Sequence, residues 1–199
     1  MKAHEKLLNG MGACSEAVAF AAQFPNLKQA WENCQIPDWM IWLLTHTGYE
    51  NPKLFRLYAC WCVRNTPLAD GRVVWDLLPD DRSKNAVVIA ELYANGEATE
   101  SELAAARYAA MDAAWAAAGA AAMDAAWAAA RAAAGDAARA GDAARAAAWA
   151  AARAGAAAGV AAGAAARAAA RDAQANHLRE LIPYTEVSKL IKAYKGSKK

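Results

Sequence analysis

Few side chains in this sequence have the types and spacing that catalysis or metal binding requires. The histidines are His4, His46 and His177, and none lies at metal-ligand spacing from a carboxylate or a cysteine. His46 ends an apolar run, where capping a helix C-terminus is its ordinary role, and His177 is expected on a helix surface. No phosphate-binding loop, nucleophile elbow or dinucleotide-binding glycine pattern is present. The sequence therefore predicts no catalytic residues, no metal and no cofactor, and a protein that is not an enzyme.

The cysteines have a structural interpretation. Cys60 and Cys62 flank Trp61, but residues two apart on a helix point to different faces, so the two thiols would not share a metal ion. We expect both to be buried structural residues. The N-terminus carries no secretory signal pattern, so these thiols and those of Cys14 and Cys34 are expected to stay reduced in a cytoplasm. No membrane span is expected, because Asp and Arg recur through the long alanine-rich part of the chain.

Two groups of arginines could contact phosphate. The first would serve a small ligand or nucleotide between the helices before residue 100, and its members are Arg56, Arg64, Arg72 and Arg82. The second lies in the alanine-rich part, where its spacing does not put all members on one helical face. That spacing, together with a net charge of +2, disfavours nucleic acid as a partner.

Helices must position these side chains, and the first half of the chain predicts several short ones. Ser15 and Asn26 are expected as cap residues, Pro37 opens a third helix, and Gly48 ends it. Large apolar residues are concentrated in this half, which therefore predicts the tight core of the protein. They include Trp31, Trp39, Trp42, Trp61 and Trp75.

Two longer helices are expected next. After Pro52, apolar residues recur at helical spacing as far as Cys62, with Arg56 and Arg64 off the apolar stripe. Another helix is predicted from Asp80-Asp81 through Tyr93, because acids stand at its start and Asn95-Gly96 stops it.

The clearest helix start is a capping box in which Thr99 is the cap and Glu102 the third helical residue. It leads into residues 103–175, which are mostly alanine, the best helix former. Internal repeats occur here. Trp115 recurs as Trp127 twelve residues later, and on a straight helix the two side chains would point about 120° apart. One uninterrupted helix would be roughly 100 Å long, so we expect the segment to fold back at its Gly-Asp steps. Partly exposed side chains here are candidates for binding a partner: Trp115, Trp127, Trp149, Arg131, Arg139 and Arg145.

The C-terminal part returns to ordinary amphipathic character. Residues 174–182 predict a helix that Pro183 breaks, and residues 185–191 predict a short helix packed on the first half. The lysines from Lys189 onward are expected to form a frayed basic terminus.

Together these patterns predict an all-α fold: a compact helical N-terminal part followed by long alanine-rich helices that fold back as a hairpin or bundle. The expected divisions are residues 1–98, an aromatic-rich helical core, 99–176, the alanine-rich repeat helices, and 177–199, a C-terminal helix with a basic tail. We expect the three to form one cooperative domain.

Several stretches resemble a family of uncharacterised, alanine-rich helical proteins of bacteria and phages, some of which are labelled Imm5-like immunity proteins. The resemblance covers about residues 38–182 and is carried by Tyr58–Arg64, Asp81–Val87, Ala90–Thr99, Glu102–Ala106 and Gln174–Arg179. It implies an all-α fold and a partner such as a toxin, or a defence protein for a relative carried by a phage. It implies no role for any single residue.

Three functions are consistent with these observations. The leading hypothesis is a non-enzymatic binding protein of the immunity or phage counter-defence type, which neutralises a partner protein by covering it with a helical surface. The second is a helical protein that binds, and so sequesters, a small ligand or nucleotide. The third is a structural protein in which the alanine repeats drive formation of a homo-oligomer.

Overall fold

The computed structural model describes residues 1–68, 70–78, 81–116 and 168–197, and side chains are described for all of these except 111–116. The helices of the N-terminal half are α1 (Ala3–Gly10), α2 (Ser15–Ala22), α3 (Leu27–Asn33), α4 (Pro37–His46) and α5 (Pro52–Asn65). They are followed by the 3₁₀ helix η1 (Val74–Leu77), α6 (Asp81–Asn95), α7 (Glu100–Ala116), a helix over residues 168–181, and α10 (Tyr184–Ser197). No strand forms among the described residues, so the all-α fold is confirmed there.

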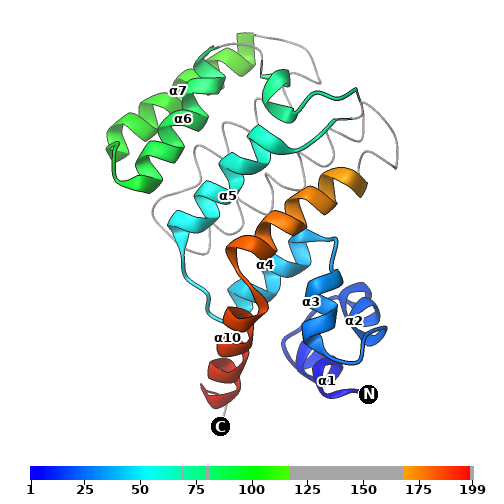
Figure 1. Ribbon diagram of the computed structural model, residues 1–199. Helices are drawn as coiled ribbons and strands as arrows, with labels where there is room; N and C mark the ends of the chain where they lie inside the picture. Colours follow the sequence, from blue (N-terminus) through cyan, green and yellow to red (C-terminus); the bar gives the residue numbers. More distant parts are fainter. Residues whose placement is uncertain (69, 79–80, 117–167, 198–199) are drawn as a thin grey trace.

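Figure 1 shows how these helices are arranged around α5. Helices α6 and α7 pack as an antiparallel hairpin along one side of α5, and α1 to α4 cluster near the other end of the molecule. The helix of residues 168–181 lies against α5 and α4, and α10 extends from it toward the C-terminus. The central helix therefore contacts α6 and a helix close to the C-terminal end of the chain.

Local signals in the sequence explain where most helices begin and end. The Asn26 side chain accepts a hydrogen bond from the Gln29 amide at 2.9 Å, as expected of a cap. The predicted capping box forms, since Thr99 Oγ1 accepts from the Glu102 amide at 3.2 Å and Glu102 accepts from the Thr99 amide at 2.7 Å. Gly48 ends α4 with a φ of +81°, a conformation that suits glycine.

Two expectations about local structure are wrong. Ser15 is not a cap but the first residue of α2: Cys14, which has extended backbone, occupies the cap position, and the Ser15 hydroxyl donates to Glu16 instead. Arg56 does not lie off the buried stripe of α5. It is buried, because its guanidinium group packs 4.7 Å from the ring centre of Tyr93 on α6.

The core draws on both ends of the chain. Its largest fully buried side chains include Tyr58 and Phe55 of α5 and also Leu178 and Ile182 near the C-terminus. Trp31 is buried as expected of the aromatic-rich half, but the other tryptophans described there are partly exposed. The first half therefore builds a complete core only with the C-terminal helices packed on it.

Buried polar contacts fix the helix of residues 168–181 in this position. The Gln174 amide donates from Nε2 to the Thr66 hydroxyl at 2.9 Å, and the Tyr58 hydroxyl donates to the Gln174 carbonyl at 3.3 Å. Near the other end of the helix, the Arg179 guanidinium donates to the carbonyls of Trp31 and Cys34 at the end of α3. The Trp31 carbonyl also accepts from the Cys34 amide at 3.3 Å, so Arg179 adds a second bond there and joins this helix to the end of α3.

The C-terminal helix is longer than expected. Residues 185–191 predicted a short helix, whereas α10 spans Tyr184–Ser197 and packs against α3. Its buried residues Val187 and Ile191 form one face of the helix. Because α10 continues to Ser197, Lys192 and Lys195 belong to a regular helix and not to a frayed terminus.

The expected fold-back of the alanine-rich part falls at residues 117–167, outside the described ranges, and so do its repeats except for residues 111–116 in α7. Among the described helices, none has the length and apolar character needed to cross a membrane.

Candidate functional site: a cleft between three helices

A cleft of about 350 Å³ opens where α5, α6 and the helix of residues 168–181 meet. Its volume lies at the lower end of the range of about 300–1,000 Å³ that is usual for small-molecule sites. Its described lining residues include apolar, aromatic, amide and charged side chains: Leu57, Trp61, Arg64, Asn65, Glu91, Asn95, His177 and Leu181. The first four recur along one face of α5 at helical spacing, which is why a single helix supplies half of them.

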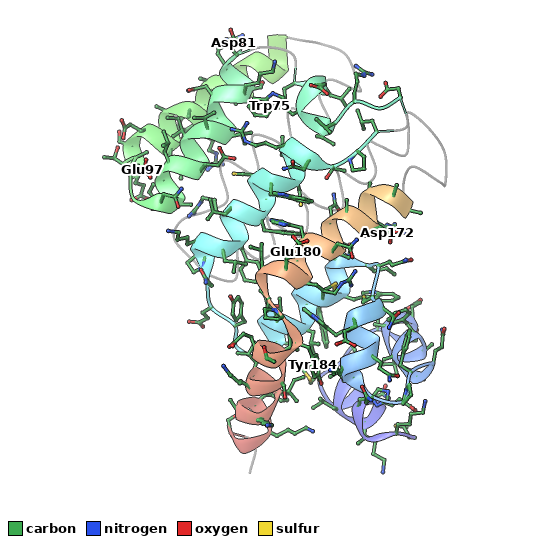
Figure 2. All side chains as sticks on the ribbon, viewed as in Figure 1. Trp75, Asp81, Glu97, Asp172, Glu180 and Tyr184 are labelled. Atoms are coloured by element: carbon green, nitrogen blue, oxygen red, sulfur yellow. The ribbon has the colours of Figure 1, made fainter. Side chains whose placement is uncertain are left out.

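An aromatic stack forms one part of this cleft. The rings of Trp61 and His177 lie 3.9 Å apart between centres and only 15° from parallel. His177 Nδ1 lies 3.2 Å from the carboxylate of Glu180 one turn further on, which orients the imidazole ring. Figure 2 shows Glu180 on the helix beside α5. His177 is therefore not the plain surface residue expected from the sequence, since its side chain is only 18% exposed.

An ion pair forms a second part. Arg64 binds Glu91 through two hydrogen bonds, Nε to Oε1 at 2.6 Å and Nη2 to Oε2 at 2.8 Å. The guanidinium group also packs 4.2 Å from the ring centre of Trp75, which Figure 2 shows near the C-terminal end of α5. The hydrogen bonds to Glu91 raise the pKa of Arg64, so its charge is permanent. Two partners therefore hold this guanidinium group in one orientation.

Two amides complete the polar lining. Asn65 donates from Nδ2 to the Trp61 carbonyl at 3.0 Å, which leaves its Oδ1 as an acceptor. Asn95 ends α6 and is exposed, with both amide functions available to a ligand. The cleft thus offers donors and acceptors beside an aromatic stack.

The four arginines proposed as phosphate contacts do not converge. Arg64 lines the cleft, whereas Arg56 is buried against Tyr93. Arg72 pairs with Asp70 at 2.7 Å in the turn after α5, and Arg82 is exposed in the first turn of α6. A phosphate in the cleft would therefore meet Arg64 without the other three.

The candidate partner-binding residues of the alanine-rich part cannot be placed. Trp115 belongs to α7, but its side chain is among those not described. The others lie outside the described residues: Trp127, Trp149, Arg131, Arg139 and Arg145.

The cysteines of α5 lie behind the cleft rather than in it. Cys60 and Cys62 are fully buried, as expected, and Cys60 donates a weak hydrogen bond to the Val87 carbonyl at 3.8 Å. Burial raises the pKa of Cys60 to about 12 and that of Cys62 still higher, so both are unreactive thiols at neutral pH. Within the described ranges, no group of three or more side chains is arranged to hold a metal ion.

A second, smaller cavity of about 50 Å³ lies between α1, α2, α3 and α4. Its lining is almost entirely apolar and includes Leu8, Phe20 and Met40. An apolar cavity of this size is an ordinary gap in side-chain packing, and it provides no polar group to orient a ligand.

The described residues form an all-α fold with a ligand-sized cleft between three of its helices. Comparison of the chain with protein-family models, with curated proteins and with solved structures gives no match. The resemblance to alanine-rich immunity proteins therefore stays a prediction.

Proposed function

We propose that this chain is a non-enzymatic binding protein that holds a small planar ligand in the cleft between α5, α6 and residues 168–181. The observation that carries the proposal is the Trp61–His177 stack at the side of a cleft of about 350 Å³. Flat ring systems gain stacking energy on such faces, and nearby hydrogen-bonding groups fix their orientation. This is the small-ligand hypothesis predicted from the sequence, with its site extended to the helix of residues 168–181.

The chemistry of the lining favours binding over catalysis. Arg64 is paired with Glu91 and His177 with Glu180, so the strongest acids and bases are engaged with each other. None of the described lining residues is a serine, threonine or cysteine that could act as a nucleophile. We propose that these paired groups orient a bound ligand.

A panel of flat aromatic compounds tests the proposal by thermal shift and titration calorimetry. A ligand at one hundred times its dissociation constant adds about 2.7 kcal/mol, or roughly 5–10 °C for a chain of this size. Trp61→Leu should reduce the shift, because the ligand loses a stacking partner. Trp42→Leu is the matched control, because Trp42 forms a similar stack with His46 at 4.1 Å outside the cleft. Equal loss of binding in both variants, or no shift by any compound, contradicts the proposal.

A protein partner is the second candidate function, as expected of an immunity or counter-defence protein. The observation in its favour is Tyr108 on α7, a large side chain that is 64% exposed. Exposed tyrosines are frequent anchors of protein interfaces. A pull-down from the native host with the wild type and with Tyr108→Ala tests this function. A specific partner should be lost from the variant, and recovery of chaperones alone with both proteins counts against it.

A further inference from the structure

The charges around the cleft restrict which planar ligand it can accept. Arg64 carries one positive charge, and the carboxylate of Glu91 lies 2.6 Å from it. Glu180 adds a second carboxylate 3.2 Å from His177. The total charge of these four side chains is −1 when His177 is neutral and zero when it is protonated. In neither state is it positive.

A phosphate group would therefore enter this cleft at a disadvantage. Proteins that bind phosphate present uncompensated cations or backbone amides to it. Here the guanidinium charge is already compensated, and no lysine is among the described lining residues. The remaining arginines of the first half, Arg56, Arg72 and Arg82, do not line the cleft.

The hydrogen-bonding groups of the cleft suit a neutral ligand instead. Nε and one N–H of Nη2 of Arg64 are used by Glu91, and within the described residues no partner occupies its Nη1. Asn65 presents an acceptor through Oδ1, and the Asn95 amide presents both a donor and an acceptor. A ring with donors and acceptors along its edge would match this set.

From these contacts we infer that the cleft binds a neutral planar heterocycle of the nucleobase type, as the free base or its nucleoside, in preference to the phosphorylated nucleotide. The ring stacks against the Trp61–His177 pair, and its polar edge bonds to Arg64, Asn65 and Asn95. This inference rests on the proposed function and specifies the ligand class of the same site.

Calorimetric titration of the full chain tests it with matched pairs of ligands: the common nucleosides, their 5′-monophosphates, and quinoline as a flat ring without a hydrogen-bond donor. At least one nucleoside should bind as tightly as its monophosphate or more tightly, with an affinity that changes little between low and physiological salt. Trp61→Leu should weaken the binding of that nucleoside by about 5- to 150-fold, the usual range for loss of a stacking partner. Trp42→Leu should leave its affinity unchanged.

A change of one carboxylate should reverse the preference. Glu91→Gln keeps the shape of the side chain but leaves the charge of Arg64 uncompensated, so binding of the monophosphate should improve by roughly tenfold relative to the nucleoside. Glu100→Gln, at the exposed start of α7 and outside the cleft, should leave the ratio unchanged. Melting temperatures of both variants show whether each is folded.

The possible results test the ligand class separately from the presence of a planar-ligand site. A wild-type protein that binds a monophosphate tenfold more tightly than its nucleoside overturns the inference but leaves a planar-ligand site in place. Binding of quinoline with no nucleoside bound has the same effect. An unchanged ligand ratio in folded Glu91→Gln also refutes the charge argument. If no flat compound binds at all, the proposed function itself fails.

Discussion

The buried bond between Gln174 and Thr66 offers the sharpest test of how the two ends of the chain are joined. Gln174 is 1% exposed and Thr66 is fully buried, and the amide donates to the hydroxyl at 2.9 Å. The bond links the helix of residues 168–181 to the end of α5. We predict that Gln174→Leu and Thr66→Val each destabilise the protein, and that the double variant is much less destabilised than the two single costs combined.

The magnitude follows from the burial of both groups. Either single change removes one partner and leaves the other polar group buried without a hydrogen bond, at a cost of about 1–3 kcal/mol. Both replacements nearly keep the side-chain volume, so cavity formation adds little. When both partners become apolar, no polar group is left unsatisfied and the cost falls toward zero. The coupling free energy between the two positions should therefore be about 1–3 kcal/mol.

Urea unfolding followed by circular dichroism measures these values, with the slope of the transition as a check that the unfolded state is unchanged. In thermal melts each single variant should lose about 2–12 °C for a chain of this length. The bond from the Tyr58 hydroxyl goes to the backbone carbonyl of Gln174, so it survives both substitutions. Single costs below about 0.5 kcal/mol, or costs that simply add in the double variant, would refute the reasoning.

Three further predictions concern single sites. In the native protein, a water-soluble thiol reagent should modify the exposed Cys14 and spare Cys60 and Cys62 until denaturant is added. Rapid modification of all three in the native state would contradict the burial of Cys60 and Cys62. Because burial raises the pKa of Cys60 from 9.0 to about 12, its contribution to stability is complete below pH 9 and is lost as the pH rises from 9 toward 12. Cys60→Ala should therefore give a flatter alkaline decline in unfolding free energy, and a decline as steep as that of the wild type speaks against this origin. Thr99→Ala removes the capping box of α7 and should cost about 1 kcal/mol in urea unfolding, whereas no loss would mean that the bonds to Glu102 do not stabilise the helix.

Helix boundaries could be predicted from the sequence because their causes are local. The cap at Asn26 and the capping box at Thr99 and Glu102 bond within one turn, so the residues that cause them are neighbours in the sequence. Ser15 shows the limit of such reasoning. Serine suits a cap position, but which residue takes the extended backbone is decided by how the chain turns after α1, and here that residue is Cys14.

The cleft could not be predicted because its parts meet only through tertiary packing. The sequence predicts Trp61 as a core residue in the helix after Pro52 and His177 on a helix surface, and no sequence pattern indicates that their side chains stack. The same is true of Arg64 and Glu91, which lie on different helices and meet across the interface between them. A buried glutamine such as Gln174 is equally hard to recognise, since its residue type is normally exposed and its partner Thr66 is distant in the chain.

The way the polar groups are held supports the proposal that the cleft binds a ligand. Arg64 is fixed from two directions by Glu91 and Trp75, and His177 is fixed by Glu180 and the ring of Trp61. A ligand that met these groups would find them already ordered, so little side-chain entropy would be lost on binding. The apolar cavity between α1 and α4 has no such supports.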